Sequence, residues 1–286
     1  MTTALVLGGG GPLGIAWQAG LLTGIGRRGI DLSRADLVLG TSAGSVVGAA
    51  LATGGDLTAL PQQVSGPLPA ASASATELGL AMALAAQITD PATAVERAIA
   101  YALGAATVEE ADFLGLPLFT AFFGTPWPAA FRCTAIDTRA QRLHVWDAAA
   151  GVGLPPALAA SCAVPGLFPP ITVQDSRYLD GGVLSVLNAT LAAGHQHVIA
   201  VSCLPLTAHD TTGKPTPTAQ RQLAEIDQLR AGGSEVVLIE PGLEFLTISE
   251  WGADVMNTAR AADAYEAGLH QADDTLFRRL SATGQQ

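Results

Sequence analysis

Ser42 has the clearest capacity for chemistry in this sequence, because it occupies the centre of a G-x-S-x-G turn formed by residues 40–44. The apolar run Leu37-Val38-Leu39 precedes the turn, and small apolar residues follow it from Ser45 to Ala52. Strand, tight turn and helix in this order form a nucleophile elbow, which presents a serine hydroxyl at a helix N-terminus. We therefore predict that Ser42 is the nucleophile of an acyl-transfer reaction, and the alternative is a plain turn between a strand and a helix.

A glycine-rich segment, Gly8–Gly14, follows an expected strand at Ala4–Leu7 and precedes an expected helix at Ile15–Gly26. Its backbone N–H groups could stabilise an oxyanion, or its G-x-G-x-x-G spacing could bind a dinucleotide. A dinucleotide site needs an acidic residue at the end of the next strand, but that strand runs directly into the Ser42 turn. Both loops follow strands and so lie at one edge of a parallel sheet, which favours an oxyanion loop beside the serine.

Asp180 is the third candidate, at an expected strand end with Gly181 and Gly182 directly behind it. An aspartate in such a turn commonly caps its own backbone. The local pattern alone therefore leaves two interpretations open, a catalytic base and a turn residue.

The composition restricts the partners that this chain can bind. The 286 residues are 49% hydrophobic and 14% charged, the net charge is −11, and Lys214 is the only lysine. This balance argues against nucleic acid and against electrostatic docking on anionic lipid. Cys133, Cys162 and Cys203 lack metal-ligand spacing and indicate free thiols in a reducing compartment, so we expect neither a metal nor a cofactor.

The N-terminal apolar stretch lacks the basic segment of a secretory signal and is cut short by glycines. We also find no apolar run that would span a bilayer. We therefore expect a cytoplasmic protein whose contact with membranes is a transient one at their surface, and the sequence does not indicate an oligomeric state.

Apolar runs and helical segments alternate along most of the chain, which predicts an α/β fold. We expect three layers, a mainly parallel central sheet with helices on both faces, in a single domain over residues 1–286. A helical cap-like segment is expected at 61–130, with helices at Thr76–Gln87 and Pro91–Leu103. Five of the eight phenylalanines fall within 113–131; we expect a core there, and the wall of an acyl-chain pocket is the alternative.

The second half of the chain continues the alternation. Further strands are expected at Phe131–Ile136, Arg139–Trp146, His197–Ser202 and Glu235–Ile239, and one long closing helix is expected at Asn257–Leu280.

Three stretches together resemble the patatin-like phospholipase family: Gly8–Gly14, Gly40-Thr41-Ser42-Ala43-Gly44 and Asp180-Gly181-Gly182, in the family's order and spacing. Residues 160–170 also resemble the stretch that usually precedes the third motif. The resemblance covers nearly the whole chain and is weakest over 61–130. It implies a Ser–Asp dyad, in which Ser42 is the nucleophile and Asp180 is the base.

The resemblance also implies an oxyanion hole formed by the N–H groups of Gly9, Gly10, Gly11 and Ala43. The family usually has lysine or arginine where this chain has Leu13, which favours neutral esters over phospholipids as substrates. The glycines that support the three motifs are Gly14, Gly40, Gly44, Gly181 and Gly182.

The implied activity is that of a serine acyl-hydrolase that cleaves fatty-acyl esters of phospholipid, lysophospholipid or neutral lipid. An α/β-hydrolase with a Ser-Asp-His triad is one alternative, with His195, His197, His209 or His270 as the third member. The early position of the serine, after only the second strand, argues against it. A catalytically weak lipid-binding or scaffold protein on the same fold is the other alternative, for which Leu13 is the only sequence argument.

Overall fold

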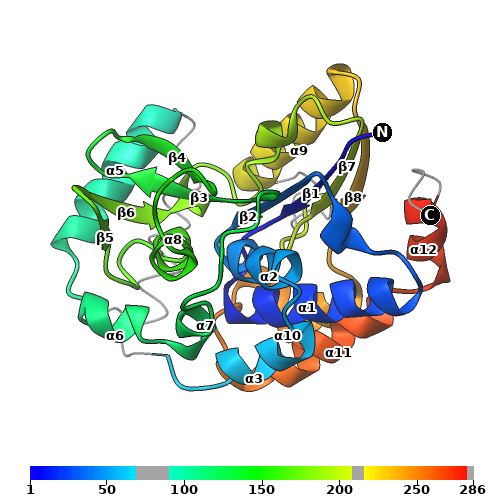
Figure 1. Cartoon of the computed structure of the whole chain (residues 1–286), viewed down its shortest axis with the longest axis horizontal. Helices are drawn as coiled ribbons and strands as arrows, with labels where there is room; N and C mark the ends of the chain where they lie inside the picture. The colour runs from blue at the N-terminus through cyan, green and yellow to red at the C-terminus, as the bar shows by residue number, and fades with distance from the viewer. Residues whose placement is uncertain (69–89, 208–215, 282–286) are drawn as a thin grey trace.

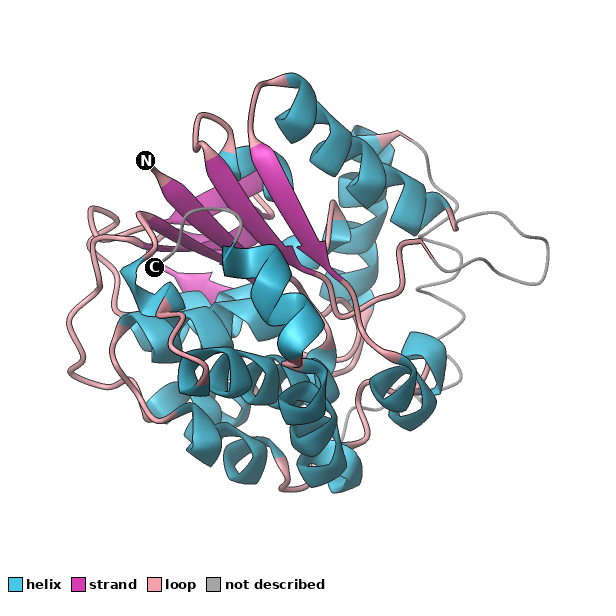
Figure 2. Cartoon of the chain, turned by 90° about the vertical axis from the view of Figure 1, so that its right-hand side faces the viewer, coloured by secondary structure: helices cyan, strands magenta, loops and turns pink. Residues whose placement is uncertain are grey.

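A computed structural model describes residues 1–68, 90–207 and 216–281 of the chain. Within these ranges a central sheet lies between helices on both of its faces (Figures 1 and 2). The helix expected at Thr76–Gln87 lies outside the described residues, as does His209. The described part contains no helix with both the length and the apolar character needed to cross a membrane.

One mixed sheet contains the eight strands of the described ranges, in the order β5-β6-β3-β2-β1-β7-β8, and β4 pairs with β3. The strands from β3 to β8 in this order are parallel neighbours. By contrast, β4 and β6 are antiparallel to β3, and β5 is antiparallel to β6. The predicted mainly parallel sheet is confirmed. The strands are β1 (Thr3–Leu7), β2 (Leu37–Thr41), β3 (Phe131–Asp137), β4 (Arg142–Trp146), β5 (Ile171–Val173), β6 (Ser176–Asp180), β7 (His197–Val201) and β8 (Glu235–Ile239).

The helices predicted after Ser42 and at Pro91–Leu103 are confirmed. The longer ones in the described chain are α1 (Gly11–Arg27), α2 (Ala43–Ala52), α5 (Pro91–Gly104), α8 (Leu154–Ser161), α9 (Pro217–Ala231), α11 (Ala261–Gln271) and α12 (Asp274–Ser281). Short helices are α3 (Leu60–Val64), α6 (Glu110–Leu114), α7 (Pro117–Thr120) and α10 (Leu243–Ile248).

Two helix predictions were wrong. The first helix begins at Gly11, inside the glycine run, and not at Ile15. The single closing helix expected at Asn257–Leu280 is divided into α11 and α12. The division has a local cause, because the Asp273 carboxylate accepts a hydrogen bond from the Leu276 N–H at 2.8 Å and so caps a new helix.

Alternate residues of the central strands pack against different helical layers. In β1, Leu5 and Leu7 belong to the cluster that contains residues of α1, α2 and α11. Ala4 and Val6 belong to the cluster that contains residues of α9. Because both faces are buried, the strand reads as an uninterrupted apolar run, which is the signal that predicted it.

Candidate active site

The glycine loop and the serine turn lie side by side because their strands are parallel neighbours. Leu7 at the end of β1 is opposite Gly40 of β2, so both strands end at the same edge of the sheet. Gly9 consequently packs beside Ser42, and a Cβ atom added to Gly9 would lie 3.3 Å from the Ser42 Cβ. The predicted juxtaposition of the two loops is confirmed.

Ser42 occupies a strained turn between β2 and α2, with φ 52° and ψ −120°. Such a conformation costs about 1–3 kcal/mol for a residue other than glycine, and its surroundings must hold it in place. The Ser42 N–H donates to the Ser161 hydroxyl at 3.0 Å, and the Ser45 hydroxyl donates to the Ser42 carbonyl at 2.6 Å. Gly44 lets the turn close, since a Cβ there would lie 2.0 Å from the Leu7 carbonyl oxygen.

Asp180 reaches Ser42 because β2 and β6 meet end to end along β3. Thr41, the last residue of β2, pairs with Thr134, and Asp180, the last residue of β6, pairs with the adjacent Ala135. Because β4 pairs with β3 alongside both of them, β2 and β6 share the opposite edge of β3. They approach from opposite directions, so the residues that end them become neighbours.

The Asp180 carboxyl group is buried, with 4% of the residue exposed. Its Oδ1 accepts the Gly182 N–H at 2.7 Å, so Asp180 caps its own turn as one interpretation expected. Burial raises the pKa of Asp180 to about 6, and the neighbouring Ser42 side chain and the hydrogen bond from the Gly182 N–H offset part of this rise. The carboxyl group that caps the turn is therefore also a close neighbour of the serine side chain.

The backbone N–H groups of the glycine loop differ in their availability. The Gly9 N–H donates to the Val186 carbonyl at 2.8 Å, so it is already engaged. Within the described residues, the N–H groups of Gly10, Gly11 and Ala43 have no hydrogen-bond partner. They belong to the starts of α1 and α2, where helix dipoles favour negative charge. The glycines that support the motifs lie in the first turn of α1 (Gly14), at the end of β2 (Gly40), in the first turn of α2 (Gly44) and in the turn after β6 (Gly181 and Gly182).

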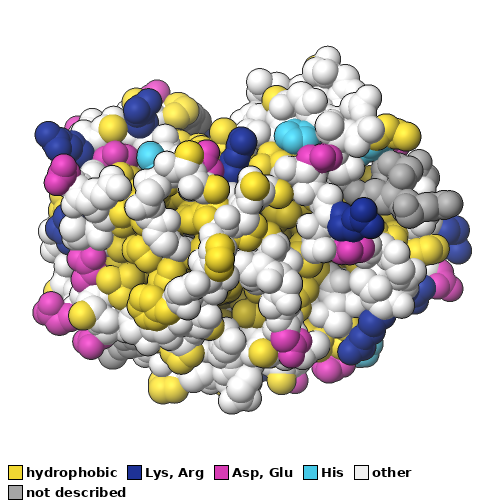
Figure 3. All heavy atoms as spheres, viewed as in Figure 1, with side chains coloured by type: hydrophobic (Ala, Val, Ile, Leu, Met, Phe, Trp, Pro, Cys, Tyr) yellow, Lys and Arg dark blue, Asp and Glu magenta, His cyan; other side chains and the backbone are white. Residues whose placement is uncertain are grey.

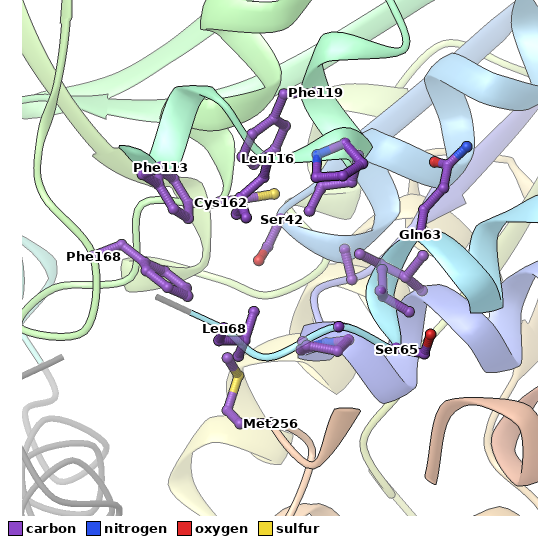
Figure 4. Close-up of a pocket in the computed structure, with 18 of the residues that line it drawn as sticks. Ser42, Gln63, Ser65, Leu68, Phe113, Leu116, Phe119, Cys162, Phe168 and Met256 are labelled. Carbon is purple, nitrogen blue, oxygen red and sulfur yellow. The ribbon is translucent and has the colours of Figure 1, made fainter. Parts of the chain in front are cut away.

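A cavity of about 490 Å³ opens beside Ser42 (Figure 4). Its lining is mainly apolar and includes Leu68, Leu116 and Met256, with Gln63 and Ser65 among the polar groups. The lining comes from the starts of α1 and α2, from α3, α6 and α7, from the residues after α8 and from the segment before α11. Such a shape and lining suit an acyl chain whose carbonyl carbon reaches the serine.

Two of the clustered phenylalanines form part of this cavity, and the others do not. Phe113 and Phe119 are lining residues, and their rings lie 5.1 Å apart. Phe122 is buried away from the lining, and Phe123 is 69% exposed. Phe168, which sequence reasoning did not place at the site, also lines the cavity and stacks on Phe113 at 4.3 Å.

Sequence reasoning also missed Ser161, the last residue of α8, and Cys162, which follows it. Ser161 holds the backbone of the nucleophile, and Cys162 lines the cavity beside it. Burial, reinforced by the nearby Asp180, raises the pKa of the Cys162 thiol far above its ordinary value. Both residues lie within the stretch at 160–170 that resembled the family, which is the signal that could have identified them.

The described histidines lie away from Ser42. His197 begins β7 opposite Thr3, the first residue of β1, so it lies at the edge of the sheet opposite to the one where Ser42 lies. Its Nδ1 atom is 3.3 Å from a carboxylate oxygen of Glu235. His195 precedes that strand, and its ring contacts the Ala192 carbonyl. His270 lies on α11 and pairs with an exposed glutamate. Within the described ranges, the late histidines therefore form no triad with the serine.

Comparison with known proteins gives a family match and distant structural similarity. A family model described as patatin-like phospholipase matches residues 5–193. No curated protein gives a significant match. Among solved structures, VipD from Legionella pneumophila has a TM-score of 0.45 and 14% identity, over 95% of this chain and 67% of that one. The type III effector protein ExoU has a TM-score of 0.36 and 16% identity, over 99% of this chain and 59% of its own.

The family match covers more than half of the chain and includes the glycine loop, the serine turn and the Asp180 motif. The mixed sheet with helices on both faces has the architecture that the resemblance implied. The chain belongs to the patatin-like phospholipase family, and by that membership it is a lipid ester hydrolase.

Proposed function

We propose that this protein hydrolyses fatty-acyl esters through a Ser42–Asp180 dyad. One observation carries the proposal: a serine in a strained turn neighbours a buried carboxylate, whose pKa its side chain lowers, at the wall of an apolar cavity. The serine is thereby supplied with a base, and the ester's acyl chain is supplied with a binding site.

The reaction begins when the Ser42 Oγ attacks the ester carbonyl carbon and its proton passes to Asp180. Collapse of the tetrahedral intermediate expels the alcohol, which takes that proton, and leaves an acyl-serine. Water then attacks the acyl-serine, gives a proton to Asp180 and releases the fatty acid. The proton returns to the serine oxygen, so one ester and one water give one acid and one alcohol.

We propose that the oxyanion of each tetrahedral intermediate is bound by the N–H groups of Gly10, Gly11 and Ala43. Their lack of partners within the described chain supports this assignment. Gly9 enters the proposal only as the residue that packs beside Ser42, since its N–H is bonded to Val186. Loss of one oxyanion donor typically lowers kcat by about 100- to 1000-fold.

The size of the cavity supports the proposed substrate class. At roughly 30 Å³ for a water-sized group, 490 Å³ holds about 16 such groups, which is enough for a medium or long acyl chain. Phospholipid, lysophospholipid and neutral lipid esters all carry such chains. Leu13, buried where the family usually has a cation, favours the neutral esters.

We propose that residues 1–286 form a single patatin-like domain, in which 61–130 acts as a helical cap beside the cavity. Packing between the ends of the chain supports one unit, because Trp17 lies 5.1 Å from Phe245 and donates to Gln271 at 3.2 Å. The contribution of α3, α6 and α7 to the cavity lining supports a cap.

We also propose that the enzyme is cytoplasmic and meets its substrate in transient contact with a lipid surface. On the face seen in Figure 3, hydrophobic side chains gather near the centre and charged ones lie mostly toward the rim. An apolar centre of this kind suits contact with lipid. The three cysteines are unpaired, which fits a reducing compartment.

Hydrolysis of p-nitrophenyl esters of increasing chain length by the wild type, Ser42→Ala and Asp180→Asn tests the proposal. We expect the wild type to hydrolyse the esters and to react with a fluorophosphonate, and we expect Ser42→Ala to do neither. Circular dichroism should show that each variant is folded. A wild type that is inert toward the esters and toward phospholipid micelles would instead favour a lipid-binding protein. Retention of activity in Asp180→Asn would exclude the dyad.

A further inference from the structure

A buried amide lies where the nucleophile strand and the base strand meet. Asn188 follows the Asp180 turn by eight residues and is 4% exposed. Its side-chain nitrogen donates to the Thr41 hydroxyl at 3.1 Å and lies 3.3 Å from the Gly181 carbonyl oxygen. Thr41 immediately precedes Ser42, and Gly181 immediately follows Asp180. One amide group therefore contacts a neighbour of each member of the dyad.

The surroundings fix the position of this amide. The Asn188 backbone adopts the left-handed conformation, with φ 52° and ψ 37°, which asparagine tolerates better than most residues. Its N–H donates to the Ser185 hydroxyl at 3.0 Å, and its side-chain nitrogen donates to the Ser185 carbonyl at 2.7 Å. The next residue, Ala189, donates its N–H to Glu225 of α9 at 2.7 Å. The backbone next to the amide is therefore tied to α9.

The sheet itself does not tie the two strands to one another. The β2 and β6 strands each pair with β3, and they meet end to end rather than side by side. Ladder hydrogen bonds run between lateral neighbours, so they fix each strand to the strands beside it and do not join β2 to β6. The Thr41 and Thr134 hydroxyls lie 2.9 Å apart where the two strands meet. The Asn188 side-chain nitrogen is 3.4 Å from the Thr134 hydroxyl. Gly181 fits closely there, since a Cβ would lie 2.3 Å from the Thr134 Oγ1.

We propose that Asn188 is a positioning residue that sets the separation between the Ser42 hydroxyl and the Asp180 carboxylate. This inference rests on the dyad proposed above and adds the group that aligns it. A displacement of about 1 Å in a catalytic group can lower the rate by about 100-fold. The link between Thr41 and Gly181 limits such a displacement along the strand direction.

The test is Asn188→Gly, because glycine retains the left-handed backbone and removes only the amide. Gln222→Ala is the matched control, since Gln222 is a buried amide on α9 whose side-chain nitrogen donates, among the residues the structure describes, to the Thr218 carbonyl of the same helix. We expect Asn188→Gly to lower kcat about 10- to 100-fold with KM changed less than twofold. The control should lose comparable thermal stability and keep its kcat.

A second readout separates positioning from a general loss of structure. The neighbouring Ser42 side chain lowers the pKa of Asp180. If removal of the amide separates the two groups, that effect weakens, and the midpoint of the kcat/KM profile moves upward from about 6. Global destabilisation would lower the yield of active enzyme without moving this midpoint.

Thr41→Val is the second variant, because it keeps the shape of the side chain and removes the oxygen that accepts the amide. It tests the same link if Asn188→Gly fails to fold, and we expect the same direction of change in kcat and in the midpoint. Unchanged kcat and midpoint in folded Asn188→Gly or Thr41→Val would overturn the inference. Inactive wild type, or active Ser42→Ala, would instead overturn the proposed function on which it rests.

Discussion

The raised pKa of Asp180 predicts an unusual pH profile for a carboxylate base. With a pKa of about 6, roughly 9% of Asp180 is ionised at pH 5, whereas the ordinary aspartate pKa of about 3.9 would give roughly 93%. Because only the ionised form accepts the Ser42 proton, kcat/KM should rise about tenfold between pH 5 and pH 8 and then level. An unperturbed aspartate would give almost no change over this range.

The assay is hydrolysis of a short p-nitrophenyl ester from pH 4.5 to pH 9, with circular dichroism at each pH to confirm folding. Asp90→Asn is the control, since Asp90 caps α5 outside the cavity lining and asparagine can keep that cap. Its replacement should leave the midpoint in place. A flat profile from pH 5 to pH 8, or a midpoint that moves in Asp90→Asn, would refute the assignment to Asp180.

The same shift predicts that the base destabilises the fold. Between pH 4 and pH 6 the folded state holds a proton on Asp180 that the unfolded chain has released, so stability falls as pH rises through this window. A shift of about two units at 1.36 kcal/mol each amounts to on the order of 3 kcal/mol above pH 6. Asp180→Asn should therefore melt higher than the wild type at pH 8, and the difference should vanish near pH 4. An equal difference at both pH values would contradict the linkage.

Three further predictions concern the surroundings of the dyad. Ser161→Ala leaves the buried N–H of the nucleophile without its acceptor, at about 1–3 kcal/mol, so fluorophosphonate labelling should slow about tenfold; an unchanged rate would show that this bond does not hold the turn. Leu116→Phe should shift the ester series toward shorter chains, because Leu116 lines the cavity, whereas Leu114→Phe on the neighbouring helix should not. Leu13→Arg, which restores the family's usual charge, should lower Tm far more than Leu13→Met, because Leu13 is fully buried; equal melting of the two variants would refute this.

The elements that the sequence predicted are those that local patterns determine. The strand before Ser42 and the helix after it appear where the apolar run and the small residues indicated. The sequence pattern did not predict the division of the closing helix, although the cap of its second part is local: Asp273 accepts from the N–H of Leu276, three residues later. Helical periodicity continues through such a cap, so the pattern favoured one long helix.

The contacts that assemble the site are long-range, and no local pattern specifies them. The meeting of β2 and β6 depends on both strands choosing one edge of β3. The engagement of the Gly9 N–H by Val186, and the stacking of Phe168 on Phe113, join segments far apart in the chain. A family resemblance can nominate Ser42 and Asp180, but it does not say which groups around them are free.

The burial that raises the pKa of Asp180 and the apolar cavity that suits an acyl chain lie in one place, since both adjoin Ser42. A bound acyl chain should displace water from this cavity and further disfavour the charged carboxylate. The midpoint of kcat, which reports the enzyme–substrate complex, should therefore lie above that of kcat/KM, which reports the free enzyme. The gap should widen from short to long esters in the same p-nitrophenyl series. Coincident midpoints at every chain length would mean that the acyl chain does not desolvate the base, and would place the chain elsewhere than in this cavity.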